Sequence, residues 1–266
     1  MTALAGACVV ITGAASGIGR GAARAFAARG ARIVLVDIDA QGLATLAAEL
    51  SADGTDALAL TSDVGAADAF DQIVSAAEAR FGAVDRLMNN VGVLATGKPE
   101  DIPPDEWLRI LNLNLMSAVR GIYRLLPDMI ARGRGHIINT ASFAGLFPYA
   151  WDRLPYVASK AALVAVSESL ALYLVPQGIG VTCFCPGPVR TAIAKSIRGW
   201  TPGIVPRGPG AQFAIKDPDE IAFLLADAVE QDIFFLPSDE HVLAEVERRG
   251  RDINAFLRGR IAATTA

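Results

Sequence analysis

Short apolar runs alternate along the chain with longer stretches in which apolar positions recur at the spacing of a helix face. The short runs, several of them rich in Val and Ile, predict buried strands at residues 8–11, 33–36, 57–60, 85–89, 136–139 and 180–185. The longer stretches predict helices at residues 20–29, 67–80, 105–131 and 156–175, with one more running through Leu43, Leu46 and Leu50.

This alternation predicts the fold class. Strands that alternate with helices pair in parallel through right-handed crossovers. The chain is therefore expected to form an α/β fold, a single Rossmann-type, doubly wound parallel sheet of about seven strands with helices on both faces. No internal repeat, low-complexity tract or linker interrupts residues 1–266, so one domain is expected.

Two segments depart from the alternation. Residues 188–216 combine many Pro and Gly residues with apolar side chains such as Ile193, Trp200 and Phe213. Loops of this length inside compact domains are either functional or disordered, and the apolar content favours a substrate lid. After an apolar run at 233–237, a charged helical tail is expected over about 238–260.

Composition narrows the class of partner and the location. Hydrophobic residues make up 52% of the 266 residues, and the formal net charge is −4, which argues against nucleic acid as a partner. No apolar run of about 18 residues is free of Arg, Asp, Gly or Pro, so no membrane span is expected. Residues 1–7 carry no basic stretch of the signal-peptide type, which favours a cytoplasmic location.

The cysteines and histidines do not predict a metal site. Cys8, Cys183 and Cys185 cannot all pair, and His136 and His241 lie far apart without ligand spacing. Cys183 and Cys185 alternate on one predicted strand, so their side chains face the same side and are expected to pack as buried thiols.

A glycine-rich turn joins the first predicted strand to the first helix. It reads Thr12-Gly13-Ala14-Ala15-Ser16-Gly17-Ile18-Gly19. Glycines allow the backbone to turn tightly and approach a pyrophosphate, while the helix N-terminus supplies free N–H groups and partial positive charge. The position between strand and helix makes this a dinucleotide site rather than an ordinary loop.

Two acidic residues follow the next two strands. Asp37 ends the second strand, where a carboxylate accepts hydrogen bonds from both ribose hydroxyls and repels a 2′-phosphate. Asp37 therefore predicts NAD rather than NADP; the alternative is that it only caps the next helix. Asp63, after the third strand, is suited equally to an adenine contact and to capping its turn.

A candidate catalytic set lies in the second half of the chain. Tyr156 and Lys160 are four residues apart on an apolar helix, so they share one face, and Ser142 ends the fifth predicted strand at the sheet edge where ligands bind. A neighbouring ammonium group and a cationic nicotinamide both favour phenolate and lower the pKa of the tyrosine. Tyr156 is then able to exchange a proton with an alcohol or ketone, while Ser142 holds the substrate oxygen.

Taken in order, these motifs resemble the short-chain dehydrogenase/reductase family over nearly the whole chain. The resemblance adds Asp63–Val64 as an adenine contact, Asn89–Gly92 as a segment that steadies the sheet, and Asn114 as the anchor of a proton-relaying water. It also adds Pro186–Gly187 with Val189 and Thr191 as the grip on the nicotinamide carboxamide. The implied catalytic residues are Asn114, Ser142, Tyr156 and Lys160. The implied cofactor-binding residues are Gly13, Ser16, Gly17, Ile18, Gly19, Asp37, Asp63, Val64, Asn90, Gly92, Tyr156, Lys160, Pro186, Gly187, Val189 and Thr191.

The sequence departs from the family pattern at two places. Val91 stands where the family has alanine, and 233–237 with a charged tail replaces the Gly-Gly strand that closes many members. In many members that last strand helps to build a tetramer. A homodimer through the outer faces of the helices that carry Asn114 and Tyr156, formed by Leu125, Leu126, Leu163, Val166 and Leu170, is the alternative to a homotetramer.

The expected substrate is a small hydrophobic alcohol or ketone. The candidate pocket residues are Leu94, Phe147, Tyr149, Trp151, Ile193, Ile197 and Trp200, although the same aromatic residues also suit the interior or a subunit contact. Lys195 and Arg198 are candidates to meet a substrate carboxylate. The chemistry predicts an NAD-dependent oxidoreductase that interconverts a hydrophobic secondary alcohol and its ketone. The alternatives are a non-catalytic NAD-binding regulator on the same fold and a reductase of carrier-protein-linked 3-oxoacyl groups.

Overall fold

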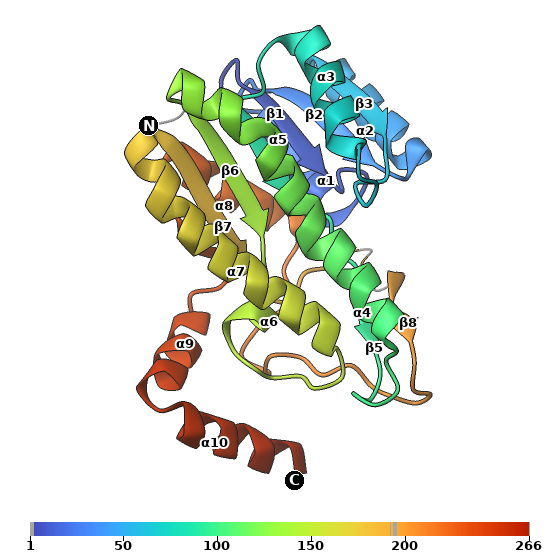
Figure 1. Cartoon of the computed structure of the whole chain (residues 1–266), viewed down its shortest axis with the longest axis vertical. Coiled ribbons are helices and arrows are strands. Elements are labelled where there is room, and N and C mark those ends of the chain that lie inside the picture. The colour runs from blue at the N-terminus through green and yellow to red at the C-terminus, as the bar shows by residue number, and fades with distance from the viewer. Residues whose placement is uncertain (1–2, 192, 194–195, 266) are drawn as a thin grey trace.

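The centre of the molecule is a sheet of seven parallel strands. The computed structural model describes residues 3–191, 193 and 196–265. The strands are β1 (Cys8–Thr12), β2 (Arg32–Asp37), β3 (Ala57–Thr61), β4 (Arg86–Asn89), β6 (Gly135–Thr140), β7 (Ile179–Cys185) and β9 (Phe235–Pro237). Their order, β3-β2-β1-β4-β6-β7-β9, reverses direction between β1 and β4 (Figure 1). The predicted doubly wound sheet is confirmed.

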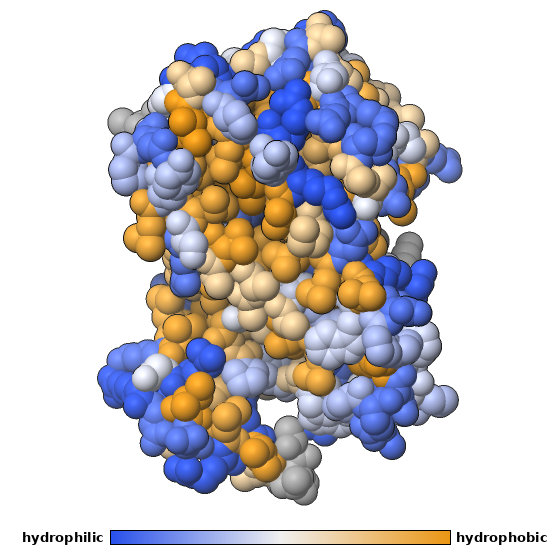
Figure 2. All heavy atoms as spheres, in the orientation of Figure 1, coloured by the Kyte–Doolittle hydropathy of each residue, from blue (hydrophilic) through white to orange (hydrophobic). Residues whose placement is uncertain are grey.

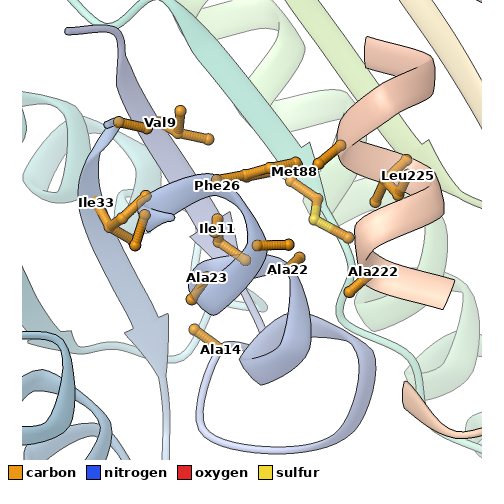
Figure 3. Close-up of a cluster of buried hydrophobic side chains, with 14 of the residues drawn as sticks. Val9, Ile11, Ala14, Ala22, Ala23, Phe26, Ile33, Met88, Ala222 and Leu225 are labelled. Atoms are coloured by element: carbon orange, nitrogen blue, oxygen red, sulfur yellow. The ribbon is translucent and has the colours of Figure 1, made fainter. Parts of the chain in front are cut away.

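Helices cover both faces because successive strand residues point to opposite sides. Val9 and Ile11 of β1 pack in a core with α1 (Gly17–Ala27), α2 (Ala40–Ala52) and α8 (Pro218–Glu230). Figure 3 shows this cluster between β1, α1 and α8, with Phe26 near its centre. Cys8 and Val10 pack on the other face with α3 (Ala69–Phe81), α5 (Ser117–Arg132) and α7 (Leu154–Leu174).

The stretch 105–131, predicted as one helix, consists of three segments. These are α4 (Pro104–Leu111), the π-helical turn η1 (Asn112–Met116) and α5. The wide turn places Asn114, 1% exposed, with its side chain in the interior, where it pairs with the backbone of Val93. The segment stays helical throughout, so the expectation of one helix did not distinguish this single wide turn from continuous α-helix.

The two ends of segment 188–216, which the sequence predicts to be a lid, pair with each other. Val189 pairs with Lys216, and the Arg190 N–H donates to the Lys216 carbonyl oxygen at 3.0 Å. Within the loop, β8 (Arg198–Gly199) pairs in parallel with β5 (Ala95–Thr96). Strands of two residues are too short to leave a sequence pattern, so neither was predicted.

The C-terminal tail forms two helices, α9 (Val242–Arg251) and α10 (Ile253–Thr265), and therefore extends beyond the expected end at 260. Asp252 separates the two helices, and its carboxylate accepts hydrogen bonds from the N–H groups of Asn254 and Ala255 at the start of α10. Phe256 of α10 packs against Phe147, just after the short helix α6 (Phe143–Leu146). The tail thus supports the segment that precedes α7.

Helix α7 with the following turn η2 (Val175–Gln177) is long and apolar enough to cross a membrane by length and composition, with a mean hydropathy of 1.4. The sequence predicts no such segment, because Arg, Asp, Gly or Pro residues interrupt its apolar runs. In the fold, Ser159, Lys160 and Ser167 of α7 are buried against the sheet. The helix is therefore part of the domain, and its outer face is an apolar surface.

Candidate active site

A cavity of about 570 Å³ opens at the carboxyl ends of β1 and β4, where the strand order reverses. This is the crevice in which doubly wound sheets bind ligands. Its lining comes from the segments that follow six of the strands and from the first turns of α7. Its volume lies within the usual range of small-molecule sites.

The glycine turn forms one wall of the cavity. Gly13 and Gly17 have φ values of +68° and +52°, which favour glycine. A Cβ on Gly19 would lie 2.1 Å from the Gly13 carbonyl oxygen, so no side chain fits there. Ser16 precedes α1 without a side-chain capping bond, so the first N–H groups of the helix keep their capacity for an anionic ligand.

Asn90 braces this turn from β4. Its Nδ2 donates to the Thr12 and Gly13 carbonyl oxygens at 3.0 and 3.3 Å. Asn89 donates to Asn139 of β6 at 2.9 Å. The Asn89–Gly92 segment therefore ties β1, β4 and β6 together, as the resemblance implies.

Asp37 faces the cavity at the end of β2. Its Oδ2 accepts from the Ala15 N–H at 3.0 Å, and its Oδ1 accepts from the Asp39 N–H at 3.1 Å. The cap of α2 is Asp39, which accepts from the Gly42 N–H, so the alternative that Asp37 caps this helix is wrong. Asp37 instead joins the glycine turn to the end of β2 at the cavity wall.

Asp63 caps its turn, and its expected contact with an adenine stays a prediction. It lines the cavity, and its Oδ1 accepts from the Gly65 N–H at 2.8 Å, which caps the turn after β3. Two arginines that precede Asp37 in the sequence are engaged elsewhere. Arg20 forms an ion pair with Glu49, and Arg32 donates to the backbone of Gly6 and Phe81.

Tyr156 and Lys160 occupy the first turns of α7 at the opposite end of the cavity. Lys160 is 3% exposed, and its Nζ donates to the Thr140 carbonyl oxygen at 2.7 Å and lies 5.8 Å from the centroid of the Tyr156 ring. Burial lowers the pKa of Lys160 to about 8. The group keeps enough basicity to be largely an ammonium ion at neutral pH.

The electrostatics of Tyr156 differ from the expectation. Burial raises the pKa of its phenol, and this effect exceeds the opposing hydrogen bond with Ser142 and the positive charge of Arg153. In the cofactor-free protein the phenol is therefore a proton donor rather than an activated base. The lowering expected at the sequence level requires a further positive charge in the cavity.

Ser142 and Asn114 complete the arrangement. Ser142 lies two residues after β6 and caps α6, and its Oγ accepts from the Ala144 N–H at 3.2 Å. Asn114 accepts from the Val93 N–H at 2.8 Å and donates to the Val93 carbonyl oxygen at 3.0 Å and to Ser159 Oγ at 3.1 Å. Asn114 thus holds the backbone beside Gly92 and contacts α7 through Ser159, a residue that the sequence did not single out.

Most predicted cofactor residues line the cavity, but not all. Those in the lining are Gly13, Ser16, Gly17, Ile18, Asp37, Asp63, Val64, Asn90, Gly92, Tyr156, Lys160, Pro186 and Thr191. Gly19, Gly187 and Val189 stand behind it. Residues absent from the prediction also contribute, namely Ile38, Asp39, Ser62, Val91, Val93, Leu113, Thr140, Ala141 and Ser196. Each is a neighbour in sequence of a predicted residue or faces one across the cavity.

The predicted substrate pocket needs correction. Of its residues only Ile193 lines the cavity. Phe147 is 2% exposed and lies in a core with Phe143, Phe213 and Phe256, and Leu94 is also buried. Trp151 and Trp200 are both 40% exposed. The Arg207 guanidinium lies over the ring of Trp151, and the backbone N–H of Trp200 donates a hydrogen bond to the Thr96 carbonyl oxygen. Ile197 is half-buried outside the lining. Arg198 pairs with Glu106, and Lys195 lies outside the described residues.

A doubly wound sheet with a glycine turn at its crevice and a Ser-Tyr-Lys set at the far end defines the class of nucleotide-binding oxidoreductases. The model of the short chain dehydrogenase family matches residues 7–202. The chain is 34% identical over 194 residues to 2,5-dichloro-2,5-cyclohexadiene-1,4-diol dehydrogenase LinX of Sphingobium indicum, covering 73% of this chain and 77% of that protein. This protein belongs to the short-chain dehydrogenase/reductase family.

Solved structures agree in fold. A short-chain dehydrogenase/reductase from Burkholderia phymatum in complex with NAD has a TM-score of 0.85 and 30% identity, covering 96% of both chains. An alcohol dehydrogenase from Thermococcus sibiricus complexed with 5-hydroxy-NADP has a TM-score of 0.73 and 25% identity, covering 87% of this chain and 94% of that one. Structural neighbours therefore bind nicotinamide cofactors of both kinds.

Proposed function

We propose that this protein is an NAD-dependent oxidoreductase that interconverts a hydrophobic secondary alcohol and its ketone. The observation that carries the proposal is that the two ends of one cavity hold different functional groups. Asp37 and the glycine turn lie at one end, and Tyr156 with Lys160 lies at the other. Asp37 and the glycine turn would hold the adenosine and pyrophosphate of a dinucleotide, and Tyr156 and Lys160 would adjoin its nicotinamide.

The residues divide the chemistry between them. The bound nicotinamide supplies or accepts the hydride. Tyr156 holds the proton that the substrate oxygen gains or loses, Ser142 orients that oxygen, and Lys160 supplies positive charge beside the phenol. Asn114 keeps the Val93 backbone and Ser159 in place beside Lys160.

The preference for NAD rests on charge. Three carboxylates, Asp37, Asp39 and Asp63, line the cavity, whereas Lys160, at the catalytic end, is the only lysine or arginine among the described lining residues. A 2′-phosphate would meet this acidic wall without a cationic partner from it. The residues present therefore suit NAD.

The substrate class rests on the catalytic end. Val93, whose backbone pairs with Asn114, and Ile193 add apolar side chains to the lining, whereas the apolar residues Val91 and Leu113 lie near Gly13 and Asp63. The similar protein LinX is named for a cyclic diol, which is consistent with an alicyclic substrate. The carrier-protein reductase alternative has no support from the acidic lining, and the non-catalytic alternative predicts a set in which one of the four residues is missing.

Assembly and location remain predictions. The outer-face residues proposed for a dimer need correction, because Leu125 and Leu163 are 1% exposed and belong to the core. Leu126, Val166 and Leu170 are half-buried, and the exposed apolar residues of this face include Tyr123, Leu172 and Tyr173. Figure 2 shows the hydrophobic area over α5 and α7. We propose a homodimer or homotetramer through this face, in the cytoplasm.

The test is a cofactor and substrate screen. The purified protein is mixed with NAD or NADP and a panel of aromatic, alicyclic and steroid secondary alcohols, and the absorbance of the reduced cofactor is followed. The proposal predicts reduction of NAD, weak or no reduction of NADP, and a preference for apolar alcohols. Binding of NAD by calorimetry without turnover of alcohols, or of ketones with NADH, would favour the non-catalytic alternative.

A further inference from the structure

The buried carboxylates of the described residues all contact segment 188–216. Carboxylates are almost never fully buried unless they are paired. Three are buried here, namely Glu106 of α4, Asp152 of the loop between α6 and α7, and Glu245 of α9, which are 3%, 1% and 9% exposed. They come from distant parts of the sequence, so the fold brings them to this one segment.

The first contact is with Arg198 of β8. Arg198 Nη1 donates to Glu106 Oε2 at 3.3 Å. Arg109, one turn further along α4, donates to both oxygens of the same carboxylate, at 2.6 and 3.0 Å. Ile193 and Ser196, which line the cavity, lie shortly before Arg198 in the sequence. Glu106 therefore holds the segment next to its cavity-lining residues.

The second contact is with the backbone of Arg207. The Arg207 N–H donates to Asp152 Oδ2 at 2.9 Å, and the Arg207 carbonyl oxygen accepts from Arg153 Nη2 at 2.8 Å. Asp152 and Arg153 themselves form an ion pair at 2.7 Å, with side chains 1% and 12% exposed. Arg153 directly precedes α7. This contact therefore joins the segment to the helix that carries Tyr156 and Lys160.

The third contact is with Gln212, whose Nε2 donates to Glu245 Oε1 at 3.4 Å. Glu245 Oε2 accepts from Arg260 Nη2 at 2.7 Å and also from Arg248. Arg260 reaches the segment itself, because its Nη1 donates to the Pro209 carbonyl oxygen at 3.5 Å. The C-terminal tail thus holds the second half of the segment through charged groups.

On the basis of the proposed function, we infer that Glu106, Asp152 and Glu245 are positioning residues that hold segment 188–216 at three successive points and so fix the wall against which the alcohol binds. Hydrogen bonds to a charged group are stronger than those between neutral groups. Such bonds keep the segment in one arrangement before the substrate arrives, which lowers the entropy that binding costs.

The start of the segment has its own attachment. Val189 pairs with Lys216, and the Arg190 N–H donates to the Lys216 carbonyl oxygen. Thr191, which is expected to bind the nicotinamide, follows directly and lines the cavity. Loss of a buried carboxylate is therefore expected to weaken the binding of alcohol and to leave the binding of NAD unchanged.

The test uses three variants that remove the charge and keep the size of the side chain, Glu106→Gln, Asp152→Asn and Glu245→Gln. With the most active alcohol of the panel, we expect the KM for the alcohol to rise about 5-fold or more in each. The kcat and the Kd for NAD, measured by calorimetry, should stay within about 2-fold. Asp227→Asn is the matched control, because its carboxylate also pairs with an arginine, Arg29, but is 56% exposed. It is expected to change none of these constants.

Limited digestion with trypsin provides a readout without substrate. Cleavage after Arg207 requires its backbone to leave Asp152 and Arg153. In Asp152→Asn this cleavage is expected to be at least about 5-fold faster, whereas cleavage after Arg80 in α3, which reports global unfolding, should keep its wild-type rate. An unchanged rate after Arg207, or equal acceleration at both sites, would overturn the inference.

The failure of the inference differs from the failure of the proposed function. An unchanged KM for the alcohol in all three variants, in a protein whose turnover depends on Tyr156, would overturn the inference and leave the proposed function standing. A wild-type protein without turnover would overturn the proposed function. In that case the rate of cleavage after Arg207 decides whether Asp152 holds the segment.

Discussion

Asp37 shows how one carboxylate links the backbone to cofactor choice. It accepts hydrogen bonds from Ala15 and Asp39, which hold it in the cavity wall where we propose that the adenosine ribose binds. Asp37→Asn keeps the shape and removes the charge. The ratio of kcat/KM for NAD to that for NADP is expected to fall at least about 10-fold, equivalent to about 1.4 kcal/mol. Asp53→Asn, at the exposed end of α2, is the control, and an unchanged ratio in Asp37→Asn would contradict the assignment.

His136 is a buried titratable group outside the active site. Its Nε2 lies 2.9 Å from Thr182 Oγ1, and the Thr182 hydroxyl itself donates to the Ile233 carbonyl oxygen. Thr182 must therefore accept from His136, which assigns the proton of the neutral ring to Nε2. Burial, aided by the nearby charge of Arg86 and opposed by Asp232, lowers the pKa of His136 to about 4.

This pKa predicts how stability changes with pH. Between the unfolded value of about 6.5 and the folded value of about 4, the unfolded chain binds the proton and the folded protein does not. Stability is therefore lost as the pH falls through this window, by up to about 3 kcal/mol. Urea unfolding at pH 7, 5 and 4 measures it. His136→Gln, which keeps a donor toward Thr182, should reduce the loss of stability between pH 7 and 4. An equally large loss in this variant would contradict the assignment of this pH dependence to His136.

The residues that sequence predicts well are those whose role is local. Gly13, Gly17 and Asp37 act through the backbone of their own turn or strand end, so their chemistry is visible in a short window. The orientation of Phe147, by contrast, depends on its contacts with Phe213 and Phe256, which are far away in sequence. Its burial in the core could therefore not be predicted.

At the scale of elements, the glycine turn and α1 form one unit. Gly19→Ala places a Cβ against the Gly13 carbonyl oxygen, which cannot move without disrupting the turn. A loss of about 1–3 kcal/mol in unfolding free energy is expected, together with weaker NAD binding by calorimetry. Gly250→Ala in α9 meets no atom within 4 Å and should stabilise the protein by up to about 1 kcal/mol. Similar effects of both changes would contradict this account of the turn.

The elements that sequence missed share a physical cause. The π-helical turn at Asn112–Met116 and the pair β5 and β8 each involve only a few residues, and their stability comes from distant partners. Asn114, for example, turns inward because Val93 and Ser159 satisfy its amide. Periodicity finds long elements with their own apolar face, which explains why the seven-stranded sheet was predicted and these segments were not.

At the scale of the whole molecule, the outer face of α5 and α7 is the surface through which we propose that subunits associate. Tyr123 of α5 and Leu172 of α7 are 82% and 83% exposed. If it is a subunit contact, a charge in its centre should separate the subunits. Leu172→Asp is expected to shift sedimentation equilibrium toward monomer, whereas Val205→Asp, on an exposed loop position, should not. A wild-type monomer would contradict the proposed assembly.

The central claim is that Tyr156 exchanges the proton during hydride transfer at this cavity. The most direct measurement compares wild type with Tyr156→Phe for NAD reduction by the preferred alcohol, with NAD binding followed by calorimetry on both proteins. We expect turnover to fall about 100-fold or more while the Kd for NAD stays within about 2-fold. Unchanged turnover in Tyr156→Phe would show that the phenol does not carry the proton and would contradict the account.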